Sequence, residues 1–157
     1  MMRSYLNDCL KIEQVMGEVY RKLAEVRIYS DKLRSIFERM AQDEDEHARQ
    51  LEVARGVPEE VFFEGVRIEP EQLDALLRRA QQLLRLADNP PRSESLMLET
   101  AKDLEREFMQ IHLHNAVKFH DVGMVELFEN LAREDSKHIE ALDAYYGAKK
   151  PPRHTWH

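Results

Sequence analysis

The sequence predicts an all-α protein, and three observations support this class. Apolar residues recur at steps of three and four, which is the spacing of an amphipathic helix. No stretch alternates apolar and polar residues as a half-buried strand does. The 157 residues include only 5 glycines and 6 prolines, so we expect long helices joined by short connections. Since 43% of the residues are hydrophobic and 34% are charged, the chain has the composition of one globular domain.

Apolar spacing places the first helix at about residues 5–29 and the start of the second near Asp31. Asp31 is a plausible N-cap, because its carboxylate can accept hydrogen bonds from the free N–H groups of the first helical turn. Gly56 and Pro58 follow the last apolar position of this second helix. Both residue types are typical of helix ends, so we expect the helix to stop there.

Two further long helices are expected in the second half of the chain. One follows the sequence NPPRSES, in which Ser93 or Ser95 can act as the N-cap. The other follows the sequence HDVGM and then meets Gly147 and Pro151, which predict its end. The sequence therefore contains two pairs of amphipathic helices.

The segment that separates the two pairs, at about residues 55–94, is far longer than a helical hairpin needs. Its residues 71–87 are themselves amphipathic and predict an extra helix. Two helix pairs joined by one long crossover form the ferritin-like four-helix bundle. We expect this bundle over residues 1–147, and a flexible tail over residues 148–157, where the apolar spacing ends.

Each of the four bundle helices carries an acidic residue in the middle of its apolar stripe. The acids, with the histidines that follow two of them, are Glu13, Glu44 with His47, Glu105, and Asp135 with His138. The acids are 31 residues apart in the first half and 30 in the second, and the second acid of each half precedes a histidine by three residues. This spacing puts acid and histidine on one helix face. Antiparallel packing then predicts that the six side chains converge in the core.

A cluster of four buried carboxylates needs compensating positive charge, because each unpaired one costs several kcal/mol and the four repel one another. Two divalent cations would neutralise them, with the two imidazoles as further ligands, as in carboxylate-bridged two-metal bundles. Oxygen ligands with one imidazole per metal favour iron or manganese, and zinc would also bind. The other reading of the DEDEH stretch is a solvated acidic face, which we expect for Asp43, Asp45 and Glu46.

On these residues the sequence resembles the rubrerythrin family of ferritin-like proteins. The resemblance is carried by EQVMGEVY, in which Glu13 precedes Tyr20 by seven residues, by EDEH from Glu44, by EREFMQIH from Glu105 and by DSKH from Asp135. It covers the four bundle helices, about two thirds of the chain. It implies a di-iron site that reacts with hydrogen peroxide or dioxygen, usually in a homodimer.

The sequence departs from that family in three ways. Rubrerythrins carry a rubredoxin-like domain with paired CxxC motifs, whereas this chain has a single cysteine, so turnover would need an external electron donor. The acid of the last helix is Asp135 where the family has Glu, and its neighbour Glu134 is the alternative, although Glu134 is rotated about 100° from the stripe. His112 stands at the position of the second half where the family has a tyrosine. Its expected role is one of three: a hydrogen-bond partner of a ligand, an extra ligand or a packed core residue.

The predicted metal site and the resemblance lead to an expected function for the protein. Iron held by the six residues would reduce hydrogen peroxide or dioxygen, and Tyr20 would donate a hydrogen bond to a ligand carboxylate, quench a stray oxidant or simply pack in the core. A ferroxidase that supplies a partner with iron, and a metal-dependent sensor or binding module without turnover, would use the same ligands. A purely structural helical module is the last alternative.

Composition also excludes some partners. The net charge is -7, with acidic and basic residues interleaved, so no basic face for nucleic acid is expected. The apolar stretches are too short for a membrane span or a signal peptide, which predicts a cytoplasmic protein. Cys9 lies on an apolar stripe and is expected to be a packed residue and not a redox thiol.

Overall fold

The computed structural model describes residues 2–56, 70–116, 119 and 121–149. Within these ranges the regular structure is entirely helical, which confirms the all-α class. The five helices are α1 (Met2–Ala24), α2 (Asp31–Arg55), α3 (Pro70–Asp88), α4 (Glu94–Ala116) and α5 (Val122–Lys149).

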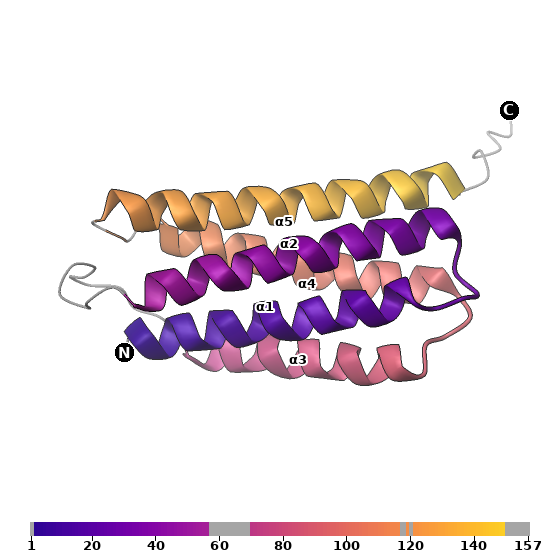
Figure 1. Ribbon diagram of the computed structural model, residues 1–157, viewed down its shortest axis with the longest axis horizontal. Coiled ribbons are helices and arrows are strands. Elements are labelled where there is room, and N and C mark those ends of the chain that lie inside the picture. Colours follow the sequence, from indigo (N-terminus) through magenta and orange to yellow (C-terminus); the bar gives the residue numbers. More distant parts are fainter. Residues whose placement is uncertain (1, 57–69, 117–118, 120, 150–157) are drawn as a thin grey trace, which may run out of the picture.

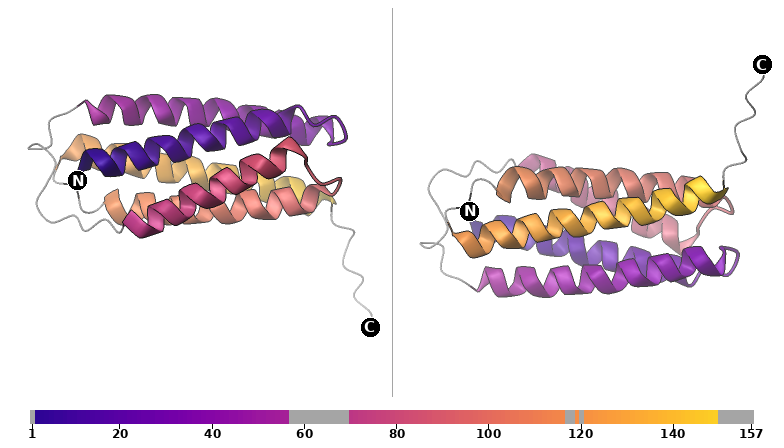
Figure 2. Two further views of the ribbon diagram at one scale, coloured as in Figure 1. Left: turned by 90° about the horizontal axis from the view of Figure 1, so that it is seen from below. Right: turned by 90° about the horizontal axis from the view of Figure 1, so that it is seen from above.

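The helices form two hairpins, α1–α2 and α4–α5, with α3 between them in the chain (Figure 1). Successive helices alternate in direction, and α2 packs against α5 where the hairpins meet. The additional helix α3 lies along the outside of α1, as Figure 2 shows from below. Its bounds agree closely with the helix predicted in the crossover. The long crossover therefore runs the length of the bundle, so that α2 and α4 have the same direction.

The connection between α1 and α2 differs from the prediction at both ends. The first helix ends at Ala24, and Tyr29 lies buried in the connection, where its hydroxyl donates to the carbonyl of Pro91 at 2.9 Å. Ser30 is the N-cap of α2, because its backbone is extended and its Oγ accepts from Leu33 N at 3.2 Å. The predicted N-cap Asp31 is instead the first helical residue, where its negative charge faces the positive end of the helix dipole.

The glycines predicted to end helices behave differently. Gly56 caps α2, and its N–H donates to the carbonyl of Val53 at 3.1 Å. Gly147, in contrast, lies inside α5, which continues to Lys149, so the predicted end of this helix is too early. An exposed glycine in a last turn costs only about 1 kcal/mol, which the rest of a long helix readily offsets. Pro58, Pro151 and the predicted tail from residue 150 onward lie outside the described residues.

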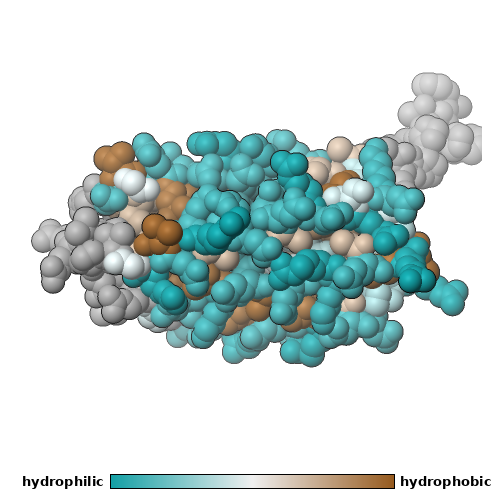
Figure 3. Space-filling model, viewed as in Figure 1, coloured by the Kyte–Doolittle hydropathy of each residue, from teal (hydrophilic) through white to brown (hydrophobic). Residues whose placement is uncertain are grey.

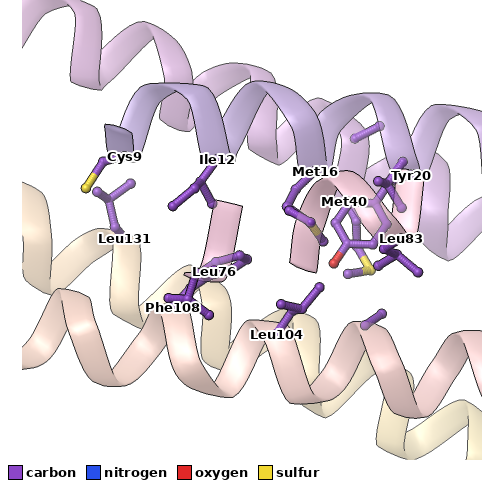
Figure 4. Packing of buried hydrophobic residues seen from close by; sticks show 14 of the residues in the cluster. Cys9, Ile12, Met16, Tyr20, Met40, Leu76, Leu83, Leu104, Phe108 and Leu131 are labelled. Atoms are coloured by element: carbon purple, nitrogen blue, oxygen red, sulfur yellow. The ribbon is translucent and has the colours of Figure 1, made fainter. Parts of the chain in front are cut away.

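The helices share one hydrophobic core (Figure 4). Leu76 and Leu83 of α3 lie in the same cluster as Ile12 and Met16 of α1, so the extra helix is a packed part of the structure. Cys9 is a free, buried cysteine in this core, as predicted. The outer surface seen in Figure 3 is mostly hydrophilic. Among the described residues, no helix combines the length and the apolar character needed to cross a membrane.

Candidate metal centre

The structure buries all six side chains that the sequence singles out, at the middle of the helices that carry them. As whole residues they are each 3% exposed or less, and they are Glu13, Glu44, His47, Glu105, Asp135 and His138. They come from α1, α2, α4 and α5. On each helix the apolar residues one turn away define the buried face. The polar residues lie on that same face and are therefore buried with them.

One half of the centre joins α1 to α2. Glu13, Glu44 and His47 each place one ligand atom within 4.8 Å of the others. His47 Nδ1 lies 3.5 Å from Glu13 Oε2 and 3.6 Å from Glu44 Oε2. These separations are too long for good hydrogen bonds, and they leave room for a cation that the atoms could share.

The other half joins α2 to α4 and α5. Glu44, Glu105, Asp135 and His138 again place their ligand atoms within 4.8 Å of one another. His138 Nδ1 lies 3.3 Å from Glu44 Oε1 and 3.5 Å from Glu105 Oε1. Glu44 belongs to both groups, so its carboxylate could be shared between two cation positions.

Four ligand-type atoms of the centre are buried without a hydrogen-bond partner. They are Glu44 Oε1, Glu105 Oε2, His47 Nδ1 and His138 Nδ1. An unsatisfied buried polar atom costs about 1–3 kcal/mol, and more where the group is charged, so a natural sequence rarely keeps four together. Two divalent cations would satisfy these atoms and offset the charge of the four acids, so the residues present fit a pair of metal ions.

The carboxyl groups of Glu13 and Glu44 hold their protons unequally. Burial, followed by the charge of Glu44, raises the pKa of Glu13 to about 7. Burial acts on Glu44 in the same direction, but the Glu13 carboxyl group and the two imidazoles beside Glu44 outweigh it and lower the pKa of Glu44. Burial lowers the pKa of His47, yet the nearby carboxyl groups of Glu13 and Glu44 raise that pKa to about 11. Without metal, protons on Glu13 and His47 therefore supply the compensating charge.

The same balance holds around α5. Burial and then the charge of Glu105 raise the pKa of Asp135 well above its usual value. Burial lowers the pKa of His138, but the charge of Glu105 and a hydrogen bond to Asp43 raise it far above the usual range for histidine. Because metal ligands must be deprotonated, a metal that enters this centre displaces these protons.

Tyr20 contacts the centre directly. Its hydroxyl donates to Glu105 Oε1 at 2.6 Å, and its ring, which has no exposed surface, stacks on Phe37 with centroids 5.9 Å apart. Of the roles predicted for Tyr20, a hydrogen bond to a carboxylate of the centre is therefore present. The bond connects α1 to α4, and thus one hairpin to the other.

His112 is also a hydrogen-bond partner of a ligand-type residue. Its Nδ1 lies 2.7 Å from Asp135 Oδ2, and its Nε2 lies 3.9 Å from Glu13 Oε1. Burial lowers the pKa of His112 to about 4, so the ring is neutral near pH 7. The structure also places Asp135 in the centre in preference to Glu134, since the Asp135 side chain is 1% exposed and Glu134 pairs with Lys137 at 3.0 Å.

Asp43 is a residue that sequence reasoning placed wrongly. It was expected on a solvated face with Asp45 and Glu46, which are indeed exposed. The Asp43 side chain is only 26% exposed, and its Oδ2 accepts from His138 Nε2 at 3.0 Å. The available signal was its spacing, because Asp43 lies three residues after buried Met40 and four before buried His47.

The chain was compared with known protein families, with curated proteins and with solved structures, and none of these comparisons gave a match.

Proposed function

We propose that this protein is a carboxylate-bridged di-iron protein, similar to the rubrerythrins, that reduces hydrogen peroxide or dioxygen. The observation that carries the proposal is the set of four buried ligand-type atoms without hydrogen-bond partners, gathered from α2, α4 and α5. A structural role for the cluster would leave these atoms unsatisfied, whereas a pair of cations satisfies all of them.

The composition of the site favours iron. Four carboxylates and two imidazoles provide oxygen-rich surroundings with one nitrogen per metal. Such hard ligand sets suit ferrous iron and manganese, while zinc sites more often include thiolates or several imidazoles. The buried Cys9 is not among the clustered ligand-type residues.

In the proposed site each residue has a distinct task. Glu44, common to both groups, would bridge the metals, and Glu13 with His47 would complete one site. Tyr20 holds Glu105 Oε1 through its hydrogen bond and so orients that carboxylate. Two ferrous ions would supply the two electrons that, with two protons, convert one hydrogen peroxide to two waters. An external electron donor would return the iron to the ferrous state.

Anaerobic titration with ferrous iron tests the site and its chemistry in turn. We expect two iron ions per chain, and then rapid oxidation of the bound iron when hydrogen peroxide or dioxygen is added. Comparing the two oxidants, with and without excess ferrous iron, distinguishes peroxide reduction from a ferroxidase activity that turns over iron itself.

Glu44→Gln is the informative variant, because the substitution removes the shared carboxylate while keeping the size of the side chain. It should lose both high-affinity irons. Asp45→Asn is its matched control, since Asp45 is the next residue along α2 but is 55% exposed and pairs with Arg21 at 2.8 Å. A wild-type protein that binds no iron, or a Glu44→Gln variant that binds and oxidises iron like the wild type, would refute the proposal.

A further inference from the structure

Asp43 lies between the candidate metal centre and a groove on the surface of the bundle. This groove, of about 500 Å³, runs between α2 and α5, and its lining includes Asp43, Glu134 and His138. The Asp43 side chain is 26% exposed, whereas that of His138 is 4% exposed. His138 is thus almost enclosed, with one ring nitrogen toward the groove side and the other toward the centre.

The contact between Asp43 and His138 defines which ring nitrogen keeps its proton when the ring is neutral, as a metal ligand must be. Nε2 of His138 lies 3.0 Å from Asp43 Oδ2. An ionised carboxylate can only accept, so Nε2 must be the donor. In the neutral ring the lone pair then belongs to Nδ1, which is the atom that faces Glu44 Oε1 at 3.3 Å and has no hydrogen-bond partner. The contact with Asp43 therefore favours the neutral tautomer whose lone pair faces the centre.

We infer that Asp43 is a positioning residue for metal binding: its carboxylate holds His138 with Nδ1 directed at the second metal position. The inference rests on the proposed function only in requiring that the centre binds metal. Histidines that bind metals commonly donate their other N–H to a carboxylate, which fixes the ring and increases its basicity, and loss of that carboxylate typically weakens binding about 10–100-fold. Arg39 Nε lies 3.6 Å from Asp43 Oδ1 and helps to hold the carboxylate in place.

The second half of the chain offers a matched control for Asp43. Asp43 directly precedes Glu44, and Glu134 directly precedes Asp135, so the two residues correspond in the duplicated pattern. Glu134 lines the same groove and has a similar exposure of 25%. Its carboxylate, however, pairs with Lys137 at 3.0 Å. Removing Glu134 should therefore change the groove without changing the support of an imidazole.

Zinc binding measures this role without any redox chemistry. The wild-type protein and the variants Asp43→Ala, Asp43→Asn and Glu134→Ala would be titrated with Zn²⁺ in competition with a chelator, and with Co²⁺ to follow the visible spectrum of each site. We expect two zinc ions in the wild type, with one of them bound about 10–100-fold more weakly in Asp43→Ala. Asp43→Asn should lose less, since an amide oxygen still accepts the Nε2–H but without charge. Glu134→Ala should match the wild type within about twofold.

The outcomes separate this inference from the proposed function. If the wild type binds two zinc ions and Asp43→Ala binds both as tightly, the inference is wrong while the metal centre stands. Equal weakening of both sites in Asp43→Ala, together with lower stability of the metal-free protein, would show a packing role and would also overturn it. A wild-type protein that binds no zinc or cobalt overturns both. Selective weakening of one site, with a changed cobalt spectrum for that site alone, supports the inference.

Discussion

His112 Nδ1 on α4 lies 2.7 Å from Asp135 Oδ2 on α5, and both side chains are buried. The contact joins the two helices of the second hairpin at the level of the candidate metal centre. Aspartate is one methylene shorter than glutamate, so its carboxylate has less reach and depends more on neighbours for its position. His112 supplies such a neighbour.

Replacing His112 by phenylalanine should destabilise the metal-free protein by about 1–3 kcal/mol, because the buried Asp135 carboxyl loses its hydrogen-bond partner. Urea unfolding in the presence of a chelator measures this loss. His114→Phe is the matched control, since His114 lies two residues further along the same helix and is exposed. The control should change stability by less than about 0.5 kcal/mol. Equal effects of the two substitutions would contradict a specific role for the His112 contact.

Tyr20→Phe should weaken metal binding about 10–100-fold, because the Glu105 carboxylate loses the hydroxyl that orients it. Chelator competition with zinc gives the affinity. Tyr29→Phe serves as control, since the Tyr29 hydroxyl bonds to the carbonyl of Pro91 in the α1–α2 connection and not to the centre. Both variants should lose some stability, but only Tyr20→Phe should lose affinity. An unchanged zinc affinity in Tyr20→Phe would show that the Tyr20 hydroxyl does not contribute to metal binding and that Tyr20 is only a packed core residue.

The metal-free protein should lose stability as the pH rises from about 6.5 to 8. The pKa of His47 is raised from 6.5 to about 11 in the folded protein, so folded chains keep this proton after unfolded chains have lost it. In this window the folded state therefore binds more protons than the unfolded state. The free energy of unfolding then falls by up to about 1.4 kcal/mol per pH unit for one such group. The pKa of Glu13, raised to about 7 by burial, acts in the same direction up to that pH.

Metal should reverse this dependence, since zinc displaces the protons of the ligands and its affinity rises with pH. Thermal unfolding at several pH values, with chelator and with zinc, measures both slopes. His47→Gln should reduce the slope of the metal-free protein, and the slope that remains comes from His138, whose pKa is also raised in the folded state. A stability that rises between pH 6.5 and 8 without metal would contradict the protonation of His47 in the folded state.

Much of the architecture could be predicted from the sequence because it depends on spacing. The positions of α2, α3 and the buried faces follow from apolar residues at steps of three and four. The inward turn of Glu44 and His47 follows from the same spacing, since residues three apart share a helix face. The ends of the helices were less predictable, because Ser30 and Asp31 are both good capping residues and the choice between them depends on the path of the connection.

The sequence by itself determined which side chains enter the core and therefore that a buried, acidic, histidine-containing cluster must exist. Only the tertiary structure decided the contacts between helices: that Glu44 is shared by the two groups, that Tyr20 reaches Glu105, and that Asp43 on α2 holds His138 on α5. The physical reason is that helical periodicity fixes the direction of a side chain about its own axis. The rotation and height of one helix relative to another are set by packing along their whole length.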